Sequence, residues 1–565
     1  MRAELIIHGR IATLAGGRGL AWAECLALGK GRVVAAGRAS EVEALRGPDT
    51  RTWSLGEDRV VIPGITDAHL HLVTAAISAT QLDLSEARHR VAIEALIAAE
   101  HARMRGTGDG AGWLLGQGWS MDRFGAWPSA ADLDQLTPGR PSALWSHDHH
   151  GLWANTLALR AAGIAAATPD PEGGLIRRDE HGAPTGMLHE HAAALLSEHV
   201  PERSDAQLEV AIGAYARMLA ELGVIGAQDP GEMRPDPELT RGPIFFARLA
   251  SAGRLPLRVA SSIRAEQIRR AIELGLKTGA PAPLDGDASP AAARRSERAP
   301  MGWLKLFADG SLGSRSAALL EPYEVEGAGG GPVGGPAGML LDRPDVLAER
   351  ASAAASAGIA VQIHGIGDRA VRVALDILET LPAMGTVRHR VEHAQLVHPD
   401  DQPRFGASGI VASVQPCHLG SDAQAARAAW GDRTAAAFPL RGLDRGGASL
   451  AFGTDAPVEP PDPWPGIALA VTRTDPGWAD DGPFHAEQSL DLAVALRAAC
   501  LGPALAAGES DRGRLVAGQR ADLLVVAADV LDEAPTPGGA LAHARPQATL
   551  LDGEFVYRAA DFPFE

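Results

Sequence analysis

Side chains that can bind a metal ion or move a proton follow short apolar runs at several distant places in this sequence. The first place is the motif Asp67-x-His69-x-His71, which follows an apolar run at 60–65 that is interrupted by Pro63-Gly64. On an extended strand side chains repeat every two residues, so Asp67, His69 and His71 share one face, and the two imidazoles can close on one metal ion. A short His-x-His pair is also compatible with two hydrogen-bonded histidines near a strand end. The metal interpretation therefore depends on residues further along the chain.

Four more residues of this kind stand in the same position relative to an apolar run: Lys305, His364, His393 and Asp455. His364, His393 and Asp455 each follow an apolar run and are themselves followed by glycine or alanine. Lys305 lies inside its run, Gly-Trp-Leu-Lys-Leu-Phe-Ala-Asp-Gly, two residues before the run ends. Neutral imidazoles and a carboxylate are good ligands for Zn²⁺ or a similar divalent ion. If the run ends converge in space, they form a metal site.

Lysine is scarce in this chain, which makes its position informative. Lys30, Lys277 and Lys305 are the only lysines among 52 basic residues. Arginine cannot lose its proton, whereas a lysine whose pKa is lowered by burial can react with carbon dioxide to give a carbamate that bridges two metal ions. The alternative is an ordinary ion pair between Lys305 and an acid such as Asp309.

The elements that would position these residues alternate between strands and helices, which is typical of a parallel α/β fold. After the opening strand we expect strands at 223–228, 257–261, 303–307, 360–364, 390–392, 410–414 and 449–453, with helices that include 346–357 and 369–381. Eight strand–helix units predict a (β/α)₈ TIM-like barrel, in which residues at the carboxyl ends of the strands converge on one site.

Two further units surround this barrel, which we place at residues 61–509. Short strands punctuated by glycine in 1–60 and in 510–565 predict a small β-sandwich domain formed by both chain termini. The first crossover, about 72–222, is too long for a loop and is interpreted as an inserted subdomain. The Gly- and Pro-rich stretch Gly327–Gly338 is either a linker or a lid over the barrel mouth.

Bulk composition excludes several classes of protein. The formal net charge of -18 argues against nucleic-acid binding, and no apolar run is long enough for a membrane span, so we expect a small-molecule substrate. The three cysteines, Cys25, Cys417 and Cys500, are too far apart in sequence for a disulfide framework or a Cys-x-x-Cys metal site, which favours a cytoplasmic location. The oligomeric state is open, with a homodimer as a common arrangement.

Longer motifs make the resemblance to a known family specific. The pattern is similar to that of the amidohydrolase superfamily, and more narrowly to its amidohydrolase-3, YtcJ-like branch, which includes N-substituted formamide deformylases. The shared motifs are 148–150 (Asp-His-His) with Trp153 and Asn155, 184–190 (Pro-Thr-Gly-Met-Leu-His-Glu), 305–315 (Lys-Leu-Phe-Ala-Asp-Gly-Ser-Leu-Gly-Ser-Arg), 390–395, 413–418 and 452–457. The chain departs from the branch at Cys417, where threonine is more usual.

The resemblance implies roles for the residues that match its motifs. His69, His71 and Asp455 would hold one divalent ion, expected to be Zn²⁺, and His364 with His393 a second, bridged by carboxylated Lys305. A single ion is also compatible with the superfamily. Asp455 would act as the general acid–base that accepts a proton from the attacking water.

Other candidates would surround this centre. His150 is expected to contact the substrate, with structural hydrogen bonding or metal binding as alternatives. Trp119 and Trp153 are expected to line the substrate pocket or to pack in a core, and Arg315 to meet a substrate carboxylate or to lie on the surface. Asp67 is expected to orient a strand-1 imidazole, and Asp309 to order the loop that follows Lys305.

Three functions are compatible with these residues. The leading hypothesis is a metal-dependent amidohydrolase that cleaves a non-peptide C–N bond of amide or formamide type in a small molecule. The second is a deaminase or cyclic-amide hydrolase on the same scaffold. The third is a non-catalytic regulatory homologue, which the presence of all the expected ligand residues disfavours.

Overall fold

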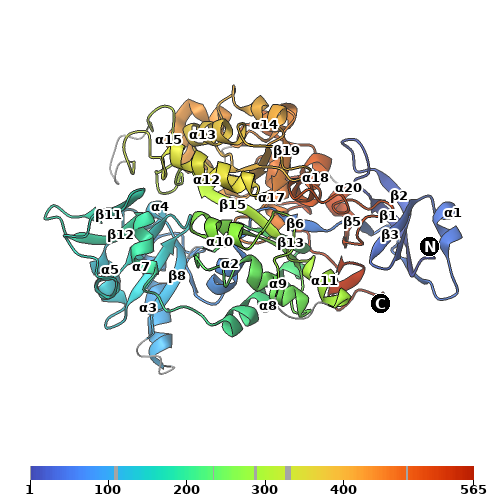
Figure 1. The fold of residues 1–565 in the computed structure, drawn as a ribbon, viewed down its shortest axis with the longest axis horizontal. Coiled ribbons are helices and arrows are strands. Elements are labelled where there is room, and N and C mark those ends of the chain that lie inside the picture. The colour runs from blue at the N-terminus through green and yellow to red at the C-terminus, as the bar shows by residue number, and fades with distance from the viewer. Residues whose placement is uncertain are drawn as a thin grey trace.

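A computed structural model describes residues 2–106, 112–232, 235–284, 289–324, 332–478, 482–532 and 534–564. Its strands form three sheets. In Figure 1 a sheet built from both ends of the chain lies on the right, a second sheet from early in the chain lies on the left, and a third, larger α/β unit fills the middle. Among the described residues, no helix combines the length and the apolarity that crossing a membrane requires.

The central unit is a nearly closed barrel of eight strands, and all of its neighbouring strands run parallel. In order around the barrel they are β6 (Ile65–Asp67), β13 (Val224–Asp229), β14 (Arg258–Arg264), β15 (Met301–Phe307), β16 (Val361–Gly365), β17 (Arg390–His393), β18 (Val411–Val414) and β19 (Ser449–Phe452). The predicted (β/α)₈ fold is therefore confirmed, with strand positions within a few residues of those expected.

The first and last barrel strands meet just beyond their carboxyl ends. The Ala68 amide donates to the Phe452 carbonyl over 2.9 Å, and the Asp455 amide donates to the His69 carbonyl over 2.7 Å. The Asp67 carboxylate strengthens this seam, because it accepts from the backbone amides of His69 and Thr454, both over 3.0 Å, and from the Thr454 hydroxyl over 2.6 Å. The seam brings His69 and Asp455, which are remote in sequence, to the same rim of the barrel.

Helices cover the outside of the barrel. They include α8 (Asp205–Glu221), α9 (Pro243–Ser251), α10 (Ile268–Glu273), α12 (Pro344–Ser356), α13 (Asp368–Leu378), α14 (Gln402–Ser408), α15 (His418–Trp430), α16 (Leu440–Arg445), α17 (Pro463–Thr472), α18 (Leu492–Cys500) and α19 (Gly502–Ala506). The apolar residues of α13 recur at helical spacing, and its buried face includes Val371, Leu375 and Leu378. This pattern is why the sequence predicts helices at 346–357 and 369–381, where α12 and α13 lie.

Both ends of the chain contribute to one eight-stranded sheet. Its strands are β1 (Leu5–Ala12), β2 (Trp22–Gly29), β3 (Arg32–Gly37), β4 (Arg51–Ser54), β5 (Arg59–Pro63), β20 (Leu523–Ala527), β21 (Ala548–Leu551) and β22 (Glu554–Arg558). The joint between the two chain ends is the antiparallel pairing of β5 with β20. Because β5 leads through Gly64 into β6, this sheet anchors the start of the barrel.

The residues between β6 and β13 form a separate layer with its own sheet. The strands are β7 (Leu82–Asp83), β8 (Leu114–Trp119), β9 (Ser142–Ser146), β10 (Gly151–Ala154), β11 (Gly174–Arg178) and β12 (Pro184–Glu190), and the helices are α3 (Arg90–Gly106), α4 (Met121–Phe124), α5 (Ala130–Leu136), α6 (Thr156–Ala161) and α7 (His191–Ser197). Helix α2 (Leu72–Ser78) leads into this insertion and packs against α8, which leads out of it.

The Gly- and Pro-rich stretch 327–338 falls partly outside the described residues, which resume at 332. Its described part packs on the loop that follows β15: the Tyr323 amide donates to Pro336 and the Leu319 amide to Ala337, both over 2.9 Å. The lid over the barrel mouth stays a prediction.

The close contact between the first and last barrel strands leaves no room for a side chain at Gly453. A Cβ added there would lie 2.5 Å from the His69 amide nitrogen and 2.9 Å from an oxygen of Asp67, both fixed by hydrogen bonds. We expect Gly453→Ala to lower the free energy of unfolding by about 1–3 kcal/mol, the usual cost of overpacking. Denaturant unfolding measures this change. The control is Gly213→Ala in α8, where the nearest atom is 3.9 Å away, and equal stability of the two variants would contradict the prediction.

Candidate metal centre

The residues predicted to bind a metal ion all lie at the carboxyl-end rim of the barrel. His69 and His71 follow β6, Lys305 and His364 lie in β15 and β16, His393 ends β17, and Asp455 follows β19. All are buried except His71, which is partly exposed. The rim thus collects these side chains as the alternation of strands and helices predicts.

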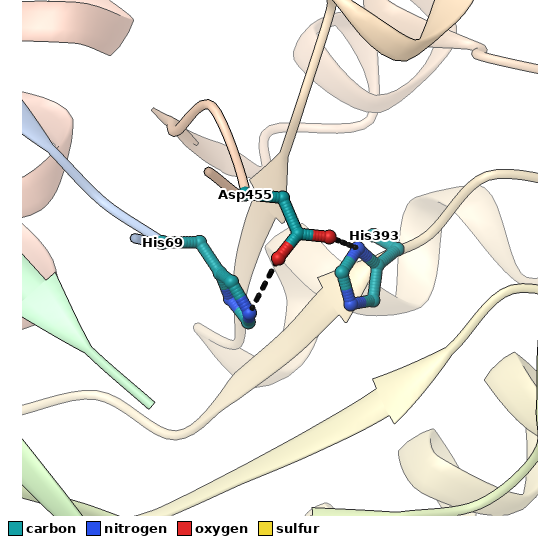
Figure 2. Close-up of side chains that lie close together, drawn as sticks. All are labelled: His69, His393 and Asp455. Carbon is teal, nitrogen blue, oxygen red and sulfur yellow. Dashed lines mark ion pairs between the residues drawn. The ribbon is translucent and has the colours of Figure 1, made fainter. Parts of the chain in front are cut away.

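His69, His393 and Asp455 form the compact core of this group, as Figure 2 shows. One potential ligand atom from each lies within 4.8 Å of the other two. The Asp455 carboxylate is central: Oδ1 is 3.5 Å from His69 Nε2 and 3.3 Å from His71 Nε2, and Oδ2 is 3.8 Å from His393 Nδ1. The His364 ring joins the group through His393, with ring centroids 4.4 Å apart.

Hydrogen-bond acceptors fix which nitrogen of each imidazole carries its proton. His69 Nδ1 lies 2.5 Å from the Glu392 carboxylate, His393 Nδ1 lies 2.9 Å from the Gln415 amide oxygen, and His364 Nε2 lies 3.0 Å from the Gly310 carbonyl. Because each of these partners only accepts, the named nitrogen donates, and the other nitrogen of the ring keeps its lone pair. This is the arrangement in which histidines ligate metals.

Burial keeps these rings neutral. It lowers the pKa of His71 to about 4 and also lowers the pKa of His69, His364 and His393 below the usual value. Neutral imidazoles can bind a cation, and a metal site needs its ligands in that form.

Orphaned polar atoms support the same interpretation. His69 Nε2, Asp455 Oδ1 and Lys305 Nζ are buried without a hydrogen-bond partner in the part of the chain that the structure describes. Leaving such atoms unpaired costs free energy, and a cation would satisfy the first two. The donor set therefore fits a divalent ion such as Zn²⁺.

Lys305 is buried within the barrel. Burial lowers the pKa of its amine to about 7, and the nearby charge of Arg264 acts in the same direction, although Glu392 opposes it. The alternative partner Asp309 is engaged elsewhere, because it accepts from the backbone amides of Ile366, Gly367 and Ala318 over 2.8–3.0 Å. The alternative prediction, an ion pair between Lys305 and Asp309, is therefore wrong. Asp309 instead links the loop after β15 to the loop after β16.

Sequence reasoning missed the acid that orients His69. We expected Asp67 to orient an imidazole, but its carboxylate bonds to backbone and to Thr454, and Glu392 takes that role. Glu392 is fully buried and is held by Arg390 over 2.8 and 3.0 Å. The available signal was an Arg-x-Glu pair inside a short buried strand, since buried charges are normally paired.

Two of these residues have strained backbones. His393 has φ 70° and Asp455 has φ 61°, in the left-handed region that side chains other than glycine rarely adopt. Such strain persists only where the surrounding structure determines it, and it is often found at functional sites.

A pocket opens beside this centre. The barrel contributes His364, His393 and Asp455 to its wall, and the insertion contributes His147, Asp148 and His150. Burial alone would lower the pKa of His150, but the charge of Glu190, whose carboxylate lies 2.7 Å from His150 Nδ1, raises it to about 9. His150 therefore stands in the pocket wall as a hydrogen-bond donor.

His418 is a further residue of the wall that sequence reasoning did not single out. Its Nε2 lies 3.3 Å from Asp455 Oδ2, and its Nδ1 lies 3.6 Å from Glu459. Burial opposes the charged ring, but these two acids raise the pKa of His418 to about 10. His418 therefore occupies one oxygen of Asp455 and leaves Oδ1 facing His69 and His71.

Three predicted substrate contacts are not in this pocket wall. Trp119 and Trp153 are fully buried in the core of the insertion, where they pack against each other with centroids 6.0 Å apart and donate to the carbonyls of Leu144 and Ser129. The packing alternative therefore holds for both. Arg315 is half-buried and also lies outside the wall, although Ser311, Leu312 and Gly313 of the same loop line it.

Comparison with known proteins places this geometry in a family. The profile described as "Amidohydrolase family" matches residues 57–557. Protein LONG AFTER FAR-RED 3 of Arabidopsis thaliana is 30% identical over 94% of this chain and 88% of its own length. The putative amidohydrolase YtcJ of Bacillus subtilis (strain 168) is 29% identical, over 90% of this chain and 91% of its own. The N-substituted formamide deformylase of Arthrobacter pascens is 27% identical over 99% of this chain and 98% of its own length.

A solved structure agrees with these relatives. An uncharacterized metal-dependent hydrolase from Pyrococcus horikoshii OT3 superposes with a TM-score of 0.71 at 26% identity, covering 94% of this chain and 99% of its own.

Glu392 gives a test of the metal centre. We expect Glu392→Gln to weaken Zn²⁺ binding roughly 10–100-fold, because the loss of a carboxylate that orients a ligand histidine has that effect in metal sites. Competition with a fluorescent chelator measures the affinity, and circular dichroism checks that the variant is folded. Glu349→Gln on the exposed face of α12 is the control. Unchanged affinity in a folded Glu392→Gln protein would refute the assignment.

Proposed function

The chain belongs to the amidohydrolase family, and on that premise we propose that it is a metal-dependent enzyme that hydrolyses a non-peptide C–N bond in a small molecule. The observation that carries the proposal is the convergence of His69, His393 and Asp455, with buried and unpaired ligand atoms, at the catalytic rim of the barrel. The bond we favour is of amide or formamide type, since a relative along nearly the whole chain is named as a formamide deformylase.

The residues that would hold the ion follow from the site. His69, His71 and Asp455 would hold one ion, and His364 with His393 would hold a second, with Lys305 as a further ligand in the form of its carbamate. A divalent ion held there would supply Lewis acidity, which lowers the pKa of water and polarises a carbonyl group.

The protein's own groups would carry the proton. His418 holds Oδ2 of Asp455 and Oδ1 faces His69 and His71, so the carboxyl group is fixed at the centre, where it would accept a proton from the attacking water. As the C–N bond breaks, the same carboxyl group can pass that proton to the leaving nitrogen, which is general acid–base catalysis. Burial alone would raise the pKa of Asp455, but the interaction with His69 and the hydrogen bonds from His418 and His71 hold that pKa well below its usual value, so the carboxyl group starts the cycle ionised.

The pocket suits a small polar substrate. Most of its wall is hydrogen-bonding side chains, among them His147, His150, Ser311, Gln395 and Ser421. His150 would contact the substrate, as its place in the wall allows. The three cysteines are free thiols, and we propose a reducing compartment such as the cytoplasm on that ground.

Product analysis tests the reaction. We expect the Zn²⁺-loaded protein to convert N-substituted formamides into formate and a primary amine, and to act more weakly on N-acyl amines and cyclic amides. Release of ammonia from aminated rings instead would favour a deaminase on the same scaffold. His69→Ala is the matched inactive variant, and full turnover by it would end the metal-dependent proposal.

Lysine carboxylation has its own test. Its chemistry needs the neutral amine, whose fraction rises as the pH passes through the Lys305 pKa of about 7. With ¹³C-bicarbonate we expect a carbamate signal by ¹³C NMR in Zn²⁺-loaded protein at pH 8 that fades near pH 5.5. Lys305→Arg should lack the signal and Lys277→Arg, at an exposed position, should keep it. A signal that survives Lys305→Arg would contradict the proposal.

A further inference from the structure

Glu190 lies where the insertion meets the barrel, beside the candidate metal centre. It is the last residue of β12, and its backbone has φ 53° in the left-handed region. Its side chain is 3% exposed, and both of its carboxylate oxygens are engaged. Oε2 lies 2.7 Å from His150 Nδ1, and Oε1 accepts a hydrogen bond from the Ser316 hydroxyl in the loop after β15.

This carboxylate is packed tightly against the loop that it contacts. A Cβ at Gly310 would lie 2.2 Å from Glu190 Oε1 and 2.1 Å from Ser316 Oγ, so only glycine allows the approach. The Gly310 carbonyl in turn accepts from His364 Nε2 over 3.0 Å. Glu190 therefore has one neighbour in the pocket wall and another that orients a candidate metal ligand.

His150 is fixed at two points. Its backbone amide donates to Asp148 Oδ1 over 3.2 Å, and Asp148 Oδ2 accepts from the hydroxyls of Ser311 and Ser314 over 2.5 and 2.9 Å. Within the described chain, Glu190 is the only residue hydrogen-bonded to the His150 ring. With Nδ1 occupied by a carboxylate, Nε2–H is the donor left for the pocket that His150 lines with His364, His393 and Asp455.

We propose that Glu190 is a positioning residue, which holds His150 so that its Nε2–H donates a hydrogen bond to the carbonyl oxygen of the substrate. The inference rests on the proposed amide hydrolysis. When water adds to the carbonyl carbon, a C–O bond forms and the π electrons move onto the oxygen. A fixed donor stabilises that charge more than it stabilises the neutral carbonyl. When the C–N bond breaks, the electrons return and the proton taken from water goes to the nitrogen.

A double-mutant cycle in the Zn²⁺-loaded protein tests the pairing of these two side chains. The variants are Glu190→Ala, His150→Ala and the double variant, together with Glu190→Gln, whose amide oxygen can still accept from Nδ1–H. Glu180→Gln, 87% exposed in the turn between β11 and β12, is the matched control. Zinc content and thermal unfolding of each variant are measured beside kcat and KM on an N-substituted formamide.

The expected result is a loss in kcat with little change in KM. Removing one oxyanion donor typically costs about 10²–10³-fold in kcat, and we expect such a loss in His150→Ala and a similar one in Glu190→Ala. The double variant should lose no more than either single variant, because both remove the same interaction. Glu190→Gln should recover part of the loss, and Glu180→Gln should match the wild type.

Other outcomes overturn the inference. Losses that multiply in the double variant would mean that the two residues act separately. An unchanged kcat in a folded His150→Ala protein would show that His150 does not donate to the substrate carbonyl. Zinc lost from Glu190→Ala but kept in His150→Ala would assign Glu190 to the support of His364 through Gly310 instead.

A binding measurement keeps the inference separate from the proposed hydrolysis. Acetohydroxamate carries an anionic oxygen that can stand in for the developing oxyanion, and calorimetry gives its affinity even if no amide is turned over. We expect Glu190→Ala and His150→Ala each to weaken its binding to the Zn²⁺-loaded protein about tenfold, with Glu180→Gln unchanged. Equal affinity in all of them would reject the dyad whether or not the protein hydrolyses amides.

Discussion

The candidate site depends on the seam where the first and last strands of the barrel meet. Asp67 is buried there and accepts hydrogen bonds from the His69 amide and from the amide and hydroxyl of Thr454. A carboxylate with three such donors fixes the two loops relative to each other, and no side chain at Gly453 separates them. His69 and Asp455 can share a cation only because this seam is closed, since they come from opposite ends of the barrel sequence.

Burial then decides the chemical state of the groups that the seam collects. Desolvation favours neutral imidazoles and a neutral lysine, which are the forms that can donate electron pairs. Fixed acceptors add direction, because Glu392 and Gln415 hold a proton on Nδ1 of His69 and of His393 and so leave the Nε2 lone pair of each ring free. The cost of burying Glu392 is offset by Arg390, whose guanidinium reaches it with two hydrogen bonds. The site is thus arranged by neighbours that would not themselves bind an ion.

The barrel and its rim residues could be predicted because they depend on local patterns. An apolar run that ends in one ligand-type residue can be recognised without knowing its neighbours, and parallel strands place such ends together. The pairing of His69 with Glu392 could not be predicted from the sequence, since the two residues are 323 positions apart and their contact depends on how the barrel closes. Trp119 shows a different limit: an aromatic-rich segment has the same composition whether it lines a pocket or fills the core of an insertion.

Both the barrel and the insertion contribute to the candidate site. The barrel supplies every candidate metal ligand, while the insertion brings His147, Asp148 and His150 to the pocket wall. The two units meet through carboxylates of the insertion that bond to serines of the loop after β15. That same loop follows Lys305 and carries Gly310, so a shift of the insertion would move groups on both sides of the pocket. The hydrogen bonds from Asp148 and Glu190 to these serines therefore tie the wall contributed by the insertion to the rim of the barrel.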